Sequence, residues 1–342
     1  MKNGRFSRKI INGVPKKMVT MRDIAEAAKV DRSTVSAVLN GSKRIRVSKE
    51  KRELILDLAE KMNYRPNLIA RSLVSRTTRT IGVFLNAPGD RFYSEMLLEL
   101  QKQIIERNYH CYFALWSELT TLKEAYNWAY GQRMDGIITC HDDVSMIPSE
   151  IPAVVFGSRQ KLKDCIYIDW NDIYRKILNY LVSLGHRKIA FTGDAVSRPN
   201  QYIPLMQEAE RAGVDDIICV SGGSNYASSI NAANKLLDLP VTERPTAVIA
   251  CNDISALNFI NSALRRGIRV PRDISVIGYD NIEDGMYSSP ALTTSSPDLV
   301  KLVRNLLDVL FRRMETPDSP LFSQPFSSEL IIRESCAELN RD

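Results

Sequence analysis

The stretch TMRDIAEAAKVDRSTVSAVLNG, residues 20–41, has the pattern of two short helices joined by a tight turn. Thr20 followed by Asp23 is typical of a capping box, and apolar side chains recur after it at helical spacing. The residues from Lys29 onward break this first helix, and Asp31 is placed to cap a second one. The stretch therefore predicts two consecutive helices separated by only a few residues.

The second helix is expected to show a polar face to solvent. Val35 and Leu39 lie one turn apart and should pack inward, and Asn40-Gly41 should end the helix because both residues tolerate positive φ. Ser48 can cap a third helix with one apolar stripe, formed by Leu54, Ile55, Leu58, Ala59 and Met62. The side chains expected to face outward on the second helix are Arg32, Ser33, Ser36 and Ala37. Three short helices with a polar second one predict a helix-turn-helix.

Charge is distributed unevenly along the 342 residues. Residues 1–80 hold 20 Lys+Arg and 7 Asp+Glu, a net +13, which leaves 26 against 33, a net −7, for the remainder. A basic head on a mildly acidic body is typical of a nucleic-acid-binding module joined to a second domain. The basic arm at residues 1–18 has two interpretations, a disordered extension or a segment that adds phosphate and minor-groove contacts.

From residue 80 onward, apolar strands alternate with amphipathic helices. Strands are expected at 81–86, 136–139, 188–192 and 246–251, with helices such as 93–107 between them. This rhythm predicts a parallel, doubly wound α/β architecture of two similar lobes. The expected domains are the arm 1–18, a helix-turn-helix 19–64, a hinge helix with linker 65–79, an N-terminal lobe 80–168 with 298–322, and a C-terminal lobe 169–297 with 323–342.

Polar residues follow several of the expected strands. Open parallel sheets bind ligands beyond the carboxyl ends of their strands, where such residues would gather. Taken singly, each of them is more often a helix cap or a turn residue, but together they favour a ligand in the cleft between the lobes. They are Asn86, Asp90, Gly157-Ser158-Arg159, Asp194, Asn252-Asp253 and Asp280-Asn281.

Several other classes of protein are disfavoured. Neither a dinucleotide-binding G-x-G-x-x-G nor a P-loop occurs, and no nucleophile–base pair stands out, which argues against an enzyme. A solute-binding transport protein would need a signal peptide and no basic head. The six cysteines and three histidines show no metal-site spacing, and buried thiols are expected. Without an apolar run long enough to span a membrane, a cytoplasmic protein is expected.

The chain resembles the lactose/galactose-repressor family of bacterial transcription regulators over residues 19–335. The matching motifs are MRDIA at 21–25, DRSTVSAVLNG at 31–41, NYRPN at 63–67, ARSL at 70–73, LGHRKIAF at 184–191, RPTA at 244–247 and ISVIGYD at 274–280. The resemblance implies a repressor whose core has the periplasmic-binding-protein architecture and whose affinity for DNA is controlled by a small molecule between the lobes.

The resemblance also implies a homodimer on a near-palindromic operator. Arg32, Ser33 and Ala37 would read bases, Thr34 and Ser36 suit phosphates, and Asn40 closes the same face. A hinge helix would form on the DNA: Asn67 can cap it, Ala70 allows close approach, and Leu73 would enter the minor groove as an apolar wedge. Family members commonly have arginine where Ala37 stands. Alanine cannot bind guanine in a bidentate way but can touch a thymine methyl, so an unusual operator base is expected.

For the effector, the resemblance carries contacts to Asn252 and Asp280, and less directly to Phe92, Asp169 and Asp253. An arginine that often grips the effector should lie near residues 198–201, where Arg198 is a candidate, and the usual aspartate after the 153–156 strand is replaced by glycine or serine. No cofactor is implied. The family favours a sugar or sugar derivative, but these departures leave the effector class open. Control by a phosphocarrier protein, as in carbon-catabolite members, stays a second interpretation.

Overall fold

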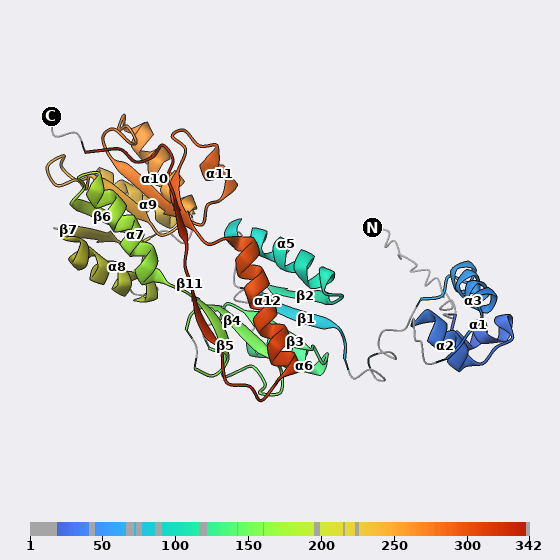
Figure 1. The fold of residues 1–342 in the computed structure, drawn as a ribbon. Helices are drawn as coiled ribbons and strands as arrows, with labels where there is room; N and C mark the ends of the chain where they lie inside the picture. Colours follow the sequence, from blue (N-terminus) through green and yellow to red (C-terminus); the bar gives the residue numbers. More distant parts are fainter. Residues whose placement is uncertain are drawn as a thin grey trace, which may run out of the picture. The chain divides into compact units, whose positions relative to one another are not determined.

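The computed structural model describes residues 19–40, 45–65, 72, 77–85, 91–115, 122–141, 143–159, 161–194, 199–214, 216–222 and 226–339. The chain divides into two compact units, Met1–Thr78 and Arg79–Asp342, which are treated separately (Figure 1). The division lies between Thr78 and Arg79, the last two residues of the linker expected from the sequence.

The first unit contains the three helices expected from the sequence. They are α1 (Met21–Ala28), α2 (Arg32–Leu39) and α3 (Lys49–Lys61). Their apolar sides form one small cluster, whose buried members are Ile24, Ala25, Ala28, Val35, Val38 and Ile55. The expected stripe on α3 is wrong at Leu54, which is 45% exposed, because Ile55 alone points directly into the cluster at that level.

The N-terminal lobe of the second unit is built on a six-stranded sheet in the order β11-β5-β4-β3-β1-β2, in which every pairing is parallel. Its strands are β1 (Thr80–Leu85), β2 (His110–Leu115), β3 (Gly136–Thr139), β4 (Ala153–Gly157), β5 (Asp164–Ile168) and β11 (Ser323–Phe326). Helices α5 (Arg91–Glu106) and α12 (Leu299–Glu315) pack on one face, and α6 (Leu122–Gly131) packs on the other.

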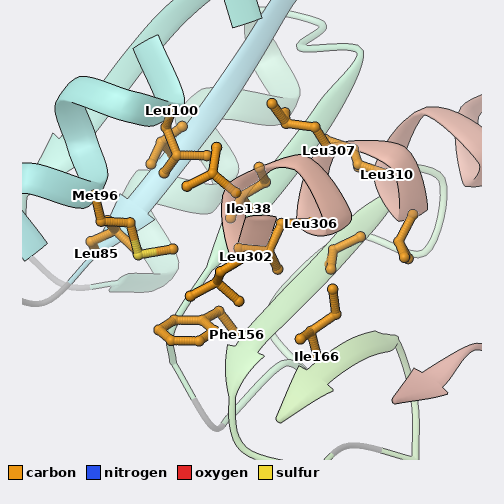
Figure 2. Packing of buried hydrophobic residues seen from close by; sticks show 14 of the residues in the cluster. Leu85, Met96, Leu100, Ile138, Phe156, Ile166, Leu302, Leu306, Leu307 and Leu310 are labelled. Atoms are coloured by element: carbon orange, nitrogen blue, oxygen red, sulfur yellow. The ribbon is translucent and has the colours of Figure 1, made fainter. Parts of the chain in front are cut away.

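The core of this lobe lies between the sheet and the α5–α12 pair. Leu302, Leu306 and Leu310 of α12 recur at helical spacing, are fully buried, and face strand residues such as Ile138 and Phe156 (Figure 2). Burying a leucine contributes about 1.5–3 kcal/mol, so this face anchors α12, which follows the C-terminal lobe in the sequence.

The C-terminal lobe repeats the plan with the order β12-β10-β9-β8-β6-β7, parallel except for β12 against β10. Helices α7 and α8 pack on one face of this sheet and α9 and α10 on the other. The strands are β6 (Lys188–Thr192), β7 (Asp216–Val220), β8 (Ala247–Ala250), β9 (Ser275–Tyr279), β10 (Thr293–Ser296) and β12 (Glu329–Ile331). The helices are α7 (Trp170–Ser183), α8 (Pro199–Ala212), α9 (Tyr226–Leu237), α10 (Asp253–Arg265) and α11 (Glu283–Met286).

The chain passes between the lobes three times, and one predicted boundary is wrong. The passages lie between β5 and α7, between β10 and α12, and between β11 and β12. Residues 323–326 were expected in the C-terminal lobe but pair with β5 in the N-terminal sheet. Pro325 cannot donate a ladder hydrogen bond, which hides this strand in the sequence, but an edge strand tolerates it.

Candidate DNA interface and effector site

Local hydrogen bonds set the geometry of the helix-turn-helix. The Thr20 amide donates to Asp23 Oδ2 at 2.7 Å and the Asp23 amide donates to Thr20 Oγ1 at 3.4 Å, which confirms the capping box. Lys29 ends α1 with φ of 51°, in the left-handed region. Asp31 occupies the N-cap position of α2 but makes no side-chain cap hydrogen bond. A short turn with a fixed left-handed residue therefore orients α2 against α1.

The polar face of α2 is largely available for contact. Arg32, Ser33 and Asn40 are exposed, and Thr34 and Ser36 are half-buried. Asn40 ends the helix with negative φ, unlike the expectation, and its Nδ2 donates to the Ser36 carbonyl at 2.8 Å and to Ser36 Oγ at 3.2 Å. These two residues therefore hold each other, which leaves Arg32 and Ser33 as the side chains with most freedom to meet a partner.

Ala37 does not face outward as predicted. It is 6% exposed, although it lies outside the hydrophobic cluster of the unit. This burial removes support for a contact between Ala37 and a thymine methyl. The sequence still has no arginine at position 37 that could bind guanine.

A groove lies where α1 meets α2, and basic residues rim it. Its lining combines three cations with two carboxylates: Arg22, Ala25, Glu26, Lys29, Val30, Asp31 and Arg32. Arg22 Nε lies 3.2 Å from Glu26 Oε1, so one cation is partly neutralised. The groove adds positive charge beside the polar face of α2, as phosphate binding requires. The hinge residues Asn67, Ala70 and Leu73 lie outside the described residues.

In the C-terminal lobe, Asn252 and Asp169 are helix caps. Asn252 is 7% exposed, and its Oδ1 accepts from the Ser255 amide at 2.9 Å at the start of α10. Asp169 is half-buried, and its Oδ1 accepts from the Asp172 amide at 3.2 Å at the start of α7. Asn252 follows a strand, as the sequence predicted, and Asp169 follows β5, a strand that was not expected, and each has at least one oxygen already in use.

Asp253 is a structural residue, which corrects its assignment as an effector contact. It is fully buried, and its two oxygens accept from Thr294 Oγ1 at 2.6 Å and from the Ile282 amide at 2.9 Å. Burial raises the pKa of Asp253 from 3.8 to about 6, against the effect of these hydrogen bonds. A Cβ at Gly278 would lie only 2.0 Å from Asp253 Oδ1, so glycine is needed there.

Asp280 and Phe92 occupy contrasting positions. Asp280 follows β9 with φ of 116°, and its backbone carbonyl accepts from Ser296 Oγ at 2.9 Å. Such a conformation costs a non-glycine residue about 1–3 kcal/mol and clusters at functional sites. Phe92 is 7% exposed and packs in the core, with its ring centroid 6.4 Å from that of Phe156. Phe92 therefore has little surface to offer a ligand, and Arg198 lies outside the described residues.

Gln201 is a candidate that sequence reasoning missed. It continues the inward face of α8, one turn before Leu205, and is 8% exposed. Its Oε1 is buried without a hydrogen-bond partner, as is Oγ1 of Thr192, the last residue of β6. Unpaired buried oxygens are rare, because each costs about 1–3 kcal/mol. A glutamine on the inward face of a helix, one turn before Leu205, was the available signal.

Metal ligands and free thiols were the other groups considered in the sequence. Within those residues, no three His, Cys, Asp or Glu side chains converge as metal ligands would. Cys165 and Cys251 are buried as expected, but Cys219 is exposed. No helix in the described ranges is long and apolar enough to cross a membrane.

Comparisons with known proteins agree with this arrangement. Residues 20–67 match the bacterial regulatory proteins of the lacI family, and residues 178–336 match a periplasmic binding protein-like domain. Catabolite control protein A of Priestia megaterium is 30% identical, over 91% of this chain and 98% of that protein. The chain belongs to the LacI family.

One further relative and one solved structure are similar to nearly the whole chain. The repressor PurR of Vibrio atlanticus (strain LGP32) is 29% identical over 94% of this chain and all of that protein. A structure of the lac repressor dimer bound to operator and the anti-inducer ONPF superposes with a TM-score of 0.84 at 25% identity, over 94% of this chain and all of that one. The protein is thus a DNA-binding transcriptional repressor with an effector-binding core, and not an enzyme.

Proposed function

We propose that α2 reads the operator through Arg32 and Ser33, with Thr34, Ser36 and Asn40 on phosphates. The observation that carries this proposal is the exposed polar face of a helix held on a small buried cluster. Arg32 can bind guanine O6 and N7 in a bidentate way, and serine can donate to or accept from a base edge. The basic groove between α1 and α2 adds attraction to the backbone.

The absence of arginine at position 37 gives this operator a distinctive half-site. We expect in vitro selection from random duplexes to return a near-palindrome without the guanine that such an arginine would read. Recovery of that guanine as the dominant base in both half-sites would contradict the proposal. Selection with Ala37→Arg should restore the guanine, which makes this variant the matched control.

The repressor is proposed to bind as a homodimer, with the hinge segment entering the central minor groove. Support comes from the lac repressor dimer, which is bound to operator in the structure that superposes on this chain. Leu73 would be the wedge and Ala70 would allow close approach, by sequence position. As a bacterial regulator of DNA, the protein is expected to act in the cytoplasm. Sedimentation showing a stable tetramer or a monomer would contradict the dimer.

The effector is proposed to bind at the carboxyl ends of the strands in the C-terminal lobe, beside Asn252, Asp280 and Gln201. The buried Oε1 of Gln201 needs a donor, which a ligand hydroxyl or N–H can supply. Gly157 or Ser158 replaces the aspartate that family members often have, and Arg198, the candidate for their arginine, lies outside the described residues, so the side chains that support the proposal are the uncharged Asn252 and Gln201 and the carboxylate of Asp280. An uncharged, hydroxyl-bearing ligand such as a sugar fits these side chains better than a phosphorylated one.

Thermal denaturation of the full chain tests this class of effector. The probes are D-ribose, D-glucose and cellobiose, against D-ribose 5-phosphate and D-glucose 6-phosphate. A ligand specific to the folded state raises the melting temperature, and a shift from an uncharged sugar supports the proposal. A shift from the phosphorylated sugars alone, or from none of the sugars, contradicts it.

The matched variants are Gln201→Met and Gln103→Met. Gln103 is 5% exposed, but its Nε2 donates to Glu99 Oε1 at 2.7 Å and to the Val300 carbonyl at 3.1 Å. We expect Gln201→Met to lose the sugar-induced shift without lowering the melting temperature of the free protein. Gln103→Met should keep the shift and lower the melting temperature. The reverse pattern would make Gln201 a structural residue.

Control by a phosphocarrier protein is the second candidate, favoured by the 30% identity to Catabolite control protein A. Titration of the purified repressor with a phosphorylated carrier protein, monitored by operator affinity, separates the two modes. Tighter operator binding with the carrier and no response to any sugar would favour the protein partner.

A further inference from the structure

One guanidinium connects the two lobes of the core. Arg91 is the first residue of α5 in the N-terminal lobe. Its Nε lies 3.5 Å from Asp284 Oδ2 and its Nη2 lies 3.7 Å from Glu283 Oε2, and both carboxylates belong to α11 of the C-terminal lobe. Its Nε also lies 3.7 Å from Glu95 Oε1 on its own helix. A single cation therefore faces three carboxylates from two lobes.

The charges at this point leave a net excess of negative charge around Arg91. Burial raises the pKa of Glu95, the nearby Arg91 guanidinium lowers it, and the negative charges of Glu283 and Asp284 raise it further. Without the guanidinium, three negative charges would repel across the lobes. Arg91 thus converts a repulsive junction into an attractive one.

Each end of this connection is fixed to buried residues of its own lobe. Glu283 directly follows Ile282, whose amide donates to the buried carboxylate of Asp253, the neighbour of Asn252. Arg91 directly precedes Phe92, which packs in the N-terminal core. A movement of one lobe relative to the other would therefore change the distances from Arg91 to α11 before it disturbed either core.

We propose that Arg91, Glu283 and Asp284 form an electrostatic strap that holds the two lobes in the observed arrangement and is loosened or tightened when they move. A role of this strap in regulation rests on the proposed effector site, whereas the ion pairs between the lobes do not depend on that site. The three side chains are about half exposed, at 48%, 64% and 57%, so salt should weaken the attraction. Exposed pairs are individually weak, and breaking this one should reduce the population of the observed arrangement by about two- to fivefold.

The distance between the lobes tests the strap without any ligand. Spin labels on non-natural side chains at Tyr130 and Val241, which are exposed on the N- and C-terminal lobes at 52% and 80%, avoid the native cysteines. In the full-length protein, Arg91→Glu should broaden or shift the label-to-label distance distribution. Combining it with Glu283→Lys and Asp284→Lys should restore the distribution, because the charges are exchanged. Salt at 1 M should move the wild type toward Arg91→Glu.

Arg107→Glu is the control, because Arg107 Nη2 lies 2.7 Å from Asp308 Oδ1 and both residues belong to the N-terminal lobe. It should leave the distribution unchanged. An unchanged distribution in Arg91→Glu, or no recovery in the exchanged variant, would overturn the strap. Because this measurement uses neither effector nor operator, its failure would leave the proposed function standing, and failure of the sugar panel would leave the strap standing.

Discussion

Polar side chains gather in two regions of the chain, the helix α2 and the strand ends of the C-terminal lobe. On α2 several of them are exposed, whereas at the strand ends several are buried and hydrogen-bonded within the protein. Arg32 and Ser33 are exposed on α2, whereas Asp253 at the strand ends is fully buried and uses both oxygens internally. On a short surface helix, a polar residue has few structural tasks. At a strand end it also caps helices and braces loops, so residue type alone does not separate ligand contacts from structural ones.

The largest effect is expected from the cluster that carries α2. Ile55 is fully buried on α3, and Ile55→Ala should cost about 2–5 kcal/mol of the free energy of unfolding, most of what a small helical unit has. Calorimetry should show loss of the helix-turn-helix transition while the core melts as before. Leu56→Ala is the control, since Leu56 is 48% exposed and its loss should change little. Equal effects of the two substitutions would contradict the observed orientation of α3.

Removal of the buried carboxylate should destabilise the core. Asp253→Ala leaves the Ile282 amide and the Thr294 hydroxyl without their acceptor, at about 2–4 kcal/mol in the free energy of unfolding. Denaturant unfolding of the core transition measures it. A variant as stable as wild type that no longer responds to effector would instead return Asp253 to the ligand contacts.

The same variant has a characteristic pH dependence. Since burial raises the pKa of Asp253 from 3.8 to about 6, the folded protein binds this proton more tightly than the unfolded chain does. The resulting contribution to stability is complete below pH 3.8 and is lost as the pH rises through 6. In Asp253→Ala, the free energy of unfolding should therefore lack the decrease between pH 4 and 6 that this carboxyl causes in the wild type.

A smaller effect, on binding and not on stability, is expected from α2. Arg32→Ala should weaken operator binding by about 1–3 kcal/mol, or roughly 5- to 150-fold, and relax the preference at one base of each half-site. Its melting temperature should match that of wild type because Arg32 is exposed. Arg22→Ala, in the groove beside it, should weaken all sequences alike. Uniform weakening by Arg32→Ala would assign Arg32 to the backbone.

The sequence predicted the helix-turn-helix and most of the alternating core because both rest on apolar periodicity. The sequence was a poorer guide to polar residues that are buried, because apolar periodicity does not mark them. Strand β10 consists of Thr293, Thr294, Ser295 and Ser296, and all four are buried. The hydroxyls of Thr293, Thr294 and Ser296 bond within the lobe, as Thr294 does with Asp253, whereas Ser295 Oγ is buried without a hydrogen-bond partner among the described residues. Ala37 shows a different failure, because helical spacing predicts the direction of a side chain but not its exposure, and Ala37 is 6% exposed.

The smallest effect is expected at Asp169, where two substitutions distinguish a helix cap from an effector contact. The family resemblance implied an effector contact at Asp169, and the structure shows its Oδ1 accepting from the Asp172 amide at 3.2 Å, as a helix cap does. Asp169→Ala should cost about 0.5–2 kcal/mol of stability, as N-cap losses do, and Asp169→Ser should recover most of it. If both variants keep the sugar-induced shift in melting temperature, the residue acts only as a cap. If Asp169→Ser regains stability but not the shift, its second carboxylate oxygen belongs to the effector site, because serine replaces the cap acceptor but not that oxygen.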